Sequence, residues 1–237
     1  MSKVTIIVNA QVEGGNISRK SPVTERMASA LAKSITQSGK NFQVEIIGGA
    51  ELWSKSIQLP PASPEYIYCP LTIKLPDWFD FPARQVYAAC RDLEARRKWV
   101  EAKFGYQTSK DNCWLGDLWL PIIMTEEKLI YGSIIAEGVI PNDYRYPYTL
   151  PSPILKKLHR LANDLLDSIG AIPSVYLLQF RLMGEDIIFD RLWPFPATPA
   201  IASIHIQQPD LFACHWYCLS RQPIKEILYP TLAAGKT

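Results

Sequence analysis

Short apolar segments separated by polar turns predict a β-α-β unit at the start of the chain. Residues 4–8 and 42–47 have the apolar composition of strands. Between them, residues 22–39 predict a helix, because Met27, Leu31 and Ile35 recur at the spacing of one helical face. This order is typical of an α/β lobe.

The second half of the chain has a different pattern. Residues 115–124 and 128–139 predict two strands, and residues 152–169 predict an amphipathic helix. Two further strands within residues 175–190 meet at the turn Met183-Gly-Glu-Asp186, and a last helix is expected from Pro209 to Leu219. The predicted fold is therefore α/β (α+β), with a mixed or antiparallel C-terminal sheet flanked by helices.

Proline-rich stretches divide the chain. The segment 59–64 is the strongest break, so we predict an N-terminal lobe over 1–60 and a C-terminal lobe over 61–237, with one continuous domain as the alternative. Residues 66–73 predict a short strand and residues 83–104 one long helix. Residues 141–153 have the Tyr and Pro content of a loop.

Composition narrows the functional classes. The 237 residues are 48% hydrophobic, which allows a sizeable core, and 25 basic against 23 acidic residues give a net charge of only +2. This balance argues against a nucleic-acid or anionic-membrane partner. No apolar run approaches the roughly 20 residues of a membrane span, and the N-terminus indicates a strand rather than a signal peptide. Five scattered cysteines favour reduced thiols and a cytoplasmic location.

Two polar residues interrupt the otherwise apolar strands of residues 175–190. Gln179 lies in the first strand and Asp190 ends the second. A buried polar side chain costs free energy unless it is hydrogen-bonded, so both residues are candidates for a site. One interpretation is a weak magnesium site with an amide and a carboxylate ligand. The other is structural: Gln179 bonds backbone groups, and Asp190 pairs with Arg191 or Arg181.

The stretch from Leu150 to Pro223 resembles the C-terminal lobe of the ATP-grasp superfamily, especially its carboxylating purine-biosynthesis branch. Residues 162–170 resemble the helix before the catalytic hairpin, and Tyr176-Leu-Leu-Gln-Phe180 resembles its first carboxylate strand. Ile187-Ile-Phe-Asp190 with the following Arg191-Leu-Trp-Pro194 resembles the second strand and its loop. The resemblance implies a nucleotide site at Gln179, Asp190 and Arg191, with ATP and magnesium as cofactors.

The sequence also departs from the ATP-grasp pattern. The first carboxylate position holds the neutral Gln179, and the second holds Asp190 in place of the usual Glu. Trp193, Phe195 and Pro196 replace the expected Arg/His/Asn cluster. Residues 105–124 are too few for the lysine-bearing lobe that covers the phosphates.

The remaining candidates are aromatic loops, histidines and cysteines. Trp78 and Phe79 in one loop, and Tyr144, Arg145 and Tyr146 in another, predict a partner-binding face or, alternatively, seals on the core. Trp114 and Trp119 form a third aromatic group. His159 belongs to a basic helix face. Cys214, His215 and Cys218 have helical spacing for a metal, but free cysteines are more often small buried hydrophobes.

Three functions follow as hypotheses. The first is a degenerate ATP-grasp-like accessory or regulatory protein, which binds a nucleotide or a protein and is not strongly catalytic. The second is an atypical ATP- and magnesium-dependent carboxylate–amine ligase. The third is an adaptor or assembly factor that docks a larger protein partner through its aromatic loops.

Overall fold

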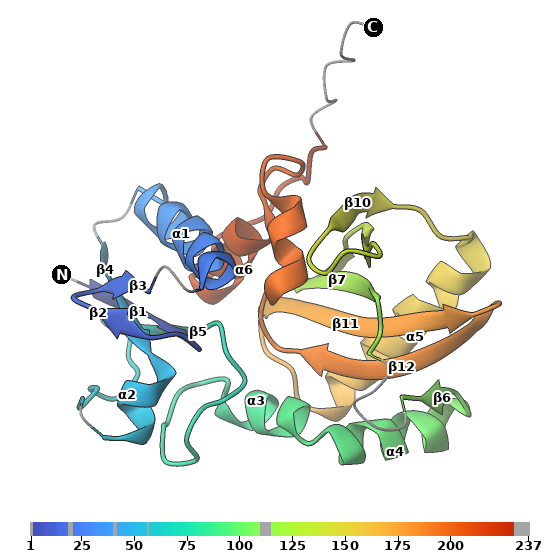
Figure 1. The fold of residues 1–237 in the computed structure, drawn as a ribbon, viewed down its shortest axis with the longest axis horizontal. Helices are drawn as coiled ribbons and strands as arrows, with labels where there is room; N and C mark the ends of the chain where they lie inside the picture. Colours follow the sequence, from blue (N-terminus) through green and yellow to red (C-terminus); the bar gives the residue numbers. More distant parts are fainter. Residues whose placement is uncertain (1, 19–20, 40–41, 56, 110–114, 230–237) are drawn as a thin grey trace, which may run out of the picture.

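A three-stranded parallel sheet forms the N-terminal part of the molecule (Figure 1). The computed structural model describes residues 2–18, 21–39, 42–55, 57–109 and 115–229. The strand order is β4-β1-β5, and both pairings are parallel. The elements here are β1 (Ser2–Val8), β2 (Val12–Glu13), β3 (Asn16–Ile17), α1 (Pro22–Thr36), β4 (Phe42–Gly48), α2 (Gly49–Trp53) and β5 (Tyr66–Pro70).

The predicted β-α-β unit is present in this sheet. Helix α1 buries Met27, Leu31 and Ile35, the residues whose spacing predicted it. Strand β5 follows the proline-rich segment 59–64 but pairs with β1. The N-terminal sheet therefore extends beyond the predicted division at residue 60.

A larger, mixed sheet forms the second part. Its main order is β10-β9-β7-β11-β12-β6, and β8 also pairs with β7. All of its pairings are antiparallel except that of β12 with β6. The strands are β6 (Gln107–Thr108), β7 (Leu118–Met124), β8 (Leu129–Tyr131), β9 (Ile134–Glu137), β10 (Tyr144–Tyr148), β11 (Ser174–Met183) and β12 (Asp186–Trp193).

Helices surround and connect the two sheets. They are α3 (Arg84–Arg91), α4 (Leu93–Phe104), α5 (Ser152–Ser168), the short 3-10 helix η1 (Thr198–Ser203) and α6 (Leu211–Leu219). In Figure 1, α3 and α4 run along the lower edge from the N-terminal part to the second sheet, and α1 and α6 lie between the two sheets. Among the described residues, no helix is long and apolar enough to cross a membrane.

Two local predictions need correction. The single helix expected over 83–104 is broken at Asp92, whose side chain caps α4 by accepting a hydrogen bond from the Ala95 amide at 3.0 Å. The loop expected over 141–153 contains β10, because its backbone pairs with β9 and thereby extends the sheet. In both places local hydrogen bonding overrides the apolar pattern.

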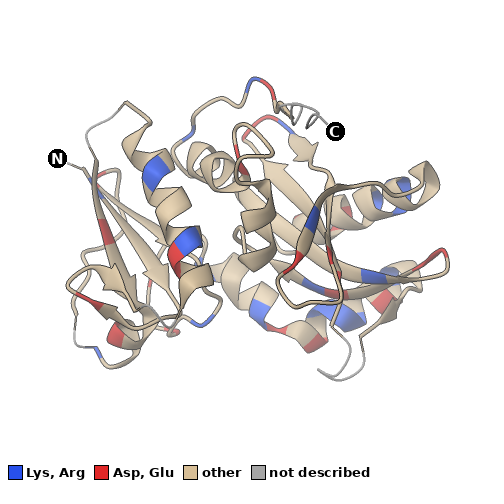
Figure 2. Ribbon diagram, turned by 45° about the horizontal axis from the view of Figure 1, so that its top comes forward, with Lys and Arg blue, Asp and Glu red and all other residues tan. Residues whose placement is uncertain are grey.

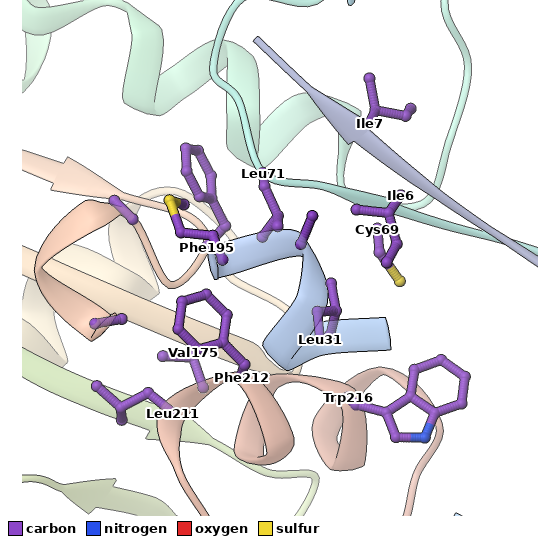
Figure 3. Packing of buried hydrophobic residues seen from close by; sticks show 14 of the residues in the cluster. Ile6, Ile7, Leu31, Cys69, Leu71, Val175, Phe195, Leu211, Phe212 and Trp216 are labelled. Atoms are coloured by element: carbon purple, nitrogen blue, oxygen red, sulfur yellow. The ribbon is translucent and has the colours of Figure 1, made fainter. Parts of the chain in front are cut away.

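One apolar cluster connects the N-terminal and C-terminal parts. It includes Ile6 of β1, Leu31 of α1, Val175 of β11, and Phe212 and Trp216 of α6, all fully buried (Figure 3). We call this set the interlobe cluster. A second cluster lies on the opposite face of the large sheet, where α5 packs against β7 and β11. The interlobe cluster therefore contains buried residues of both sheets.

Candidate functional site

The β11–β12 hairpin contains a β-bulge at the predicted site. Gln179 pairs with Arg191 and Phe180 pairs with Phe189, so Asp190 between them has no partner in the register. A bulge of this kind redirects the side chain of the extra residue and commonly lies near functional sites. Asp190 is completely buried, and Gln179 is only 5% exposed. Both polar side chains must therefore find partners within the protein.

Arginine groups surround the Asp190 carboxylate. Its Oδ1 accepts a hydrogen bond from Arg97 Nη2 of α4 at 2.8 Å and another from Arg191 Nε at 3.2 Å. Arg97 Nε also donates to the Asp190 backbone carbonyl at 3.1 Å. Both arginine side chains are largely buried. Charge-assisted hydrogen bonds in this geometry offset the desolvation of the carboxylate.

Gly116 connects Asp190 to Gln179. The Gly116 N–H donates to Asp190 Oδ2 at 2.9 Å, and the Gly116 carbonyl accepts from Gln179 Nε2 at 2.6 Å. A Cβ atom at this position would lie 2.5 Å from the Phe180 carbonyl oxygen, closer than real contacts allow. Only glycine lets the backbone before β7 approach the bulge this closely.

Trp193 completes the group. Its Nε1–H donates to Gln179 Oε1 at 2.9 Å, and the Arg191 guanidinium lies 5.4 Å from the centre of its indole ring. We call Arg97, Gly116, Gln179, Asp190, Arg191 and Trp193 the Asp190 network. The network joins α4, the chain before β7 and the β11–β12 hairpin. Its hydrogen bonds satisfy the polar groups of Gln179 and Asp190, the two predicted magnesium ligands.

The donor set does not fit magnesium. Mg²⁺ in proteins requires carboxylate oxygens that are free to face the ion. Both Asp190 oxygens already accept hydrogen bonds, and a cation there would meet the like charges of Arg97 and Arg191. The Gln179 amide oxygen is taken by Trp193. Within the described residues, no group of three or more His, Cys, Asp or Glu side chains could hold a metal ion.

The sequence identifies Gln179, Asp190 and Arg191 as site residues, but not Arg97, Gly116 or Trp193. In the sequence, Arg97 shares one face of the helix predicted over 83–104 with Cys90, Leu93 and Val100. A charged residue on such an apolar face is a signal that it meets a buried acid. Asp190 pairs with Arg191, as the structural interpretation expected, and with Arg97 in place of Arg181. Gly116 carried no signal, because its role depends on the bulge in a distant hairpin.

The first aromatic pair divides between surface and core. Trp78 is 45% exposed, and the Lys55 ammonium lies 6.0 Å from its ring centre. Phe79 is only 3% exposed and stacks on Phe81 with the ring centres 5.1 Å apart. Phe79 therefore seals the core and presents no face to a partner.

The second aromatic group lies on the edge strand β10. The Tyr144 ring packs edge-on against Trp119, and the Tyr146 hydroxyl donates to the Gln207 side chain. Burial raises the pKa of both tyrosines, with Tyr229 adding to the effect at Tyr146. Arg145 points outward and is exposed. Trp114 lies outside the described residues, as does Cys113.

His215, Cys214 and Cys218 are buried, and their arrangement does not form a metal site. His215 is 2% exposed, and its Nδ1 lies 3.2 Å from Ser174 Oγ and accepts from the Val175 amide at 3.4 Å. Burial lowers the pKa of His215 to about 3. Burial also raises the pKa of the Cys218 thiol to about 12. These groups are therefore neutral in the core at physiological pH.

Known structures share the overall fold at low sequence identity. N5-carboxyaminoimidazole ribonucleotide synthetase from Thermus thermophilus superimposes with a TM-score of 0.65 at 11% identity, covering 93% of this chain and 79% of that one. The fold is ATP-grasp-like. The synthetase from Staphylococcus aureus, complexed with ADP, gives a TM-score of 0.65 at 10% identity over 96% of this chain and 80% of its own. Glycinamide-RNase-transformylase T from Mycobacterium tuberculosis gives 0.64 at 12% identity, over 94% and 80%.

Sequence comparison supports the same relationship over part of the chain. Formate-dependent phosphoribosylglycinamide formyltransferase from Prochlorococcus marinus is 24% identical over 120 residues, which are 49% of this chain and 31% of that protein. The Francisella tularensis formyltransferase is 25% identical over 99 residues, 40% and 25% of the two chains. Each alignment thus spans less than a third of its curated relative. No protein family model matches the sequence.

Proposed function

We propose that this ATP-grasp-like chain is an accessory or regulatory protein of the cytoplasm that has lost magnesium-dependent catalysis. The observation that carries the proposal is the Asp190 network. In the ATP-grasp pattern two hairpin carboxylates face magnesium and the ATP phosphates. Here the corresponding Gln179 and Asp190 bind Trp193, Gly116 and two arginines of the same chain.

The short connection between α4 and β7 supports the same proposal. Residue 104 ends α4 and residue 118 begins β7, with only the two-residue strand β6 among the described residues between them. Gly116, near the end of this connection, contacts both carboxylate positions. The protein's own backbone therefore contacts the groups that would otherwise face a ligand. We propose that the hairpin became a structural element and that function moved to protein contacts or to nucleotide binding without turnover.

The test is calorimetric titration of ATP and of ADP, each with and without magnesium. The proposal expects no binding that requires magnesium and no nucleotide turnover. Asp190→Asn should leave any weak nucleotide affinity unchanged, and Asp80→Asn, at an 88% exposed side chain, serves as the matched control. Magnesium-dependent binding that disappears in Asp190→Asn but not in Asp80→Asn would overturn the proposal.

A second candidate is an atypical ATP- and magnesium-dependent carboxylate–amine ligase. It is favoured by the fold neighbours, since the Staphylococcus aureus synthetase was crystallised with ADP and the Aspergillus clavatus synthase with ATP. For a ligase, the salt bridge between Arg97 and Asp190 must open when nucleotide binds. Phosphate release that depends on a carboxylate and an amine substrate, and that is lost in Asp190→Asn, would establish this activity.

A third candidate function is an adaptor that docks a protein partner, which fewer residues support in the structure than in the sequence. Of its predicted docking residues, Trp78 and Arg145 remain exposed, whereas Phe79 is buried and the Tyr146 hydroxyl is engaged by Gln207. We propose Trp78, the most exposed of the predicted aromatic docking residues, as the anchor for a protein partner.

A further inference from the structure

A cavity of about 610 Å³ lies between α1 and the segment that leads into α6, apart from the Asp190 network. One wall is formed by Arg26, Ser29 and Lys33 of α1 and by Gln37 just after it, and the other includes His205 and Gln208. The volume is within the roughly 300–1,000 Å³ typical of small-molecule sites. Figure 1 shows α1 and α6 side by side in the middle of the molecule.

The α1 wall of this cavity is cationic. Arg26 and Lys33 are seven residues apart, so they lie two turns apart on the same helical face, with their Cα atoms separated by about 10 Å along the axis. Neither forms an ion pair with a residue that the structure describes. Basic positions of the helices are drawn in blue in Figure 2. Two exposed and unpaired cations at one cavity attract an anion.

The single acid among the described lining residues is already used. Asp210 Oδ1 accepts hydrogen bonds from the Phe212 and Ala213 amides at 2.9 Å and 2.8 Å, and so caps α6. Its pKa is raised by burial, while Lys33 and His205 act in the opposite direction. Asp210 therefore neutralises the α6 N-terminus, and the cavity retains a net positive charge.

His205 belongs to the turn that forms part of the second wall. Its φ angle of 68° lies in the left-handed region, which is uncommon for a residue other than glycine. This conformation occurs at a residue that lines the cavity and lies near Asp210.

We propose that this cavity, the α1–α6 cavity, binds a phosphorylated small molecule. Arg26 and Lys33 contact the phosphate oxygens, since guanidinium and ammonium groups are the usual protein ligands of phosphate. His205 and Gln208 supply further hydrogen bonds. The organic part rests on the apolar lining formed by Ala30 and Tyr217. This site is independent of the function proposed for the Asp190 network.

The test is calorimetric titration of the full chain with inorganic pyrophosphate in the absence of magnesium. We expect saturable binding that Arg26→Gln and Lys33→Gln each weaken by about tenfold, the loss typical of one hydrogen bond to a charged group. Lys33→Arg should retain most of the affinity. Both side chains are exposed, so each variant should unfold at the wild-type temperature.

Lys156→Gln, at an exposed lysine on α5, is the control for general surface charge. Its affinity for pyrophosphate should equal that of the wild type. Absence of saturation at millimolar pyrophosphate, or an equal loss in Lys156→Gln and Lys33→Gln, would overturn the proposal.

Discussion

The interlobe cluster and the Asp190 network both hold distant parts of the chain together, but by different physics. The cluster joins the two sheets through apolar contacts that are non-directional and additive over area. The network joins α4, the chain before β7 and the β11–β12 hairpin through directed hydrogen bonds among buried charges. An apolar core loses stability gradually on substitution, whereas a buried polar network fails when one partner leaves another unpaired.

The largest loss of stability is expected when Asp190, the only carboxylate of the network, is replaced. Asp190→Asn preserves the shape of the side chain but leaves Arg97 and Arg191 buried without an opposite charge. We expect the free energy of unfolding to fall by about 3–5 kcal/mol. Chemical denaturation of the variant measures this loss, and Asp80→Asn should stay close to wild type. Similar stability for Asp190→Asn and Asp80→Asn would contradict the structural role of Asp190.

The corresponding test of the interlobe cluster is Leu31→Ala. Leu31 is fully buried between the N-terminal sheet and α6, so truncation leaves a cavity that neighbouring side chains fill only in part. A loss of about 3 kcal/mol is expected in the same denaturation experiment. Arg26→Ala on the exposed side of α1 is the control and should change stability little. A two-step transition in Leu31→Ala would show that the two sheets unfold separately, contrary to a continuous core.

A smaller, pH-dependent effect is expected at His215, which lies where α6 meets β11. Burial holds the pKa of this imidazole at about 3, below its ordinary value of 6.5. The unfolded chain therefore binds the proton more readily, so this stability is complete above pH 6.5 and declines as the pH falls toward 3.

Between pH 7 and pH 5 the free energy of unfolding of the wild type should fall by about 2 kcal/mol through this histidine. His215→Gln should not show this fall. The measurement is the slope of unfolding free energy against pH, which is insensitive to any constant cost of the substitution. His159→Gln, on the partly exposed face of α5, controls for histidine titration in general. Parallel slopes for wild type and His215→Gln would show that His215 does not resist protonation.

The smallest effect on stability is expected at Trp78. Its side chain is 45% exposed, so Trp78→Ala should change the free energy of unfolding by about 0.5 kcal/mol or less. If the adaptor function is correct, the same variant should fail to retain a partner in an affinity purification. Met183→Ala, another exposed apolar side chain at the tip of the hairpin, is the matched control. Equal recovery of the partner by both variants would remove Trp78 as an anchor.

The sequence was sufficient for the parts of the fold that depend on local pattern. Helices α1 and α5 and the β11–β12 hairpin follow the periodicity of their apolar residues. The same pattern misplaced features that depend on distant partners. Strand β5 lies after a proline-rich break yet pairs with β1. Strand β10 was missed for a different reason: its Tyr and Pro content is typical of a loop, but its backbone pairs with the neighbouring strand β9.

In the candidate site, too, the residues that follow from local sequence pattern differ from those that depend on distant partners. Gln179 and Asp190 were identifiable because polar residues within apolar strands are costly. Arg97 was not identifiable as the partner of Asp190, because 93 residues separate the two and no periodic pattern links them. The conformation of Gly116 likewise depends on a bulge in another element.

The most direct test of the central claim is a double-mutant cycle on Arg97 and Asp190. The free energies of unfolding of wild type, Arg97→Gln, Asp190→Asn and the double variant are measured under the same conditions without nucleotide or magnesium. If the carboxylate is held by this arginine, the two losses should fail to add by about 1–3 kcal/mol. Additive losses, within about 0.5 kcal/mol, would show that Arg97 does not hold Asp190 and would contradict the structural role of this salt bridge.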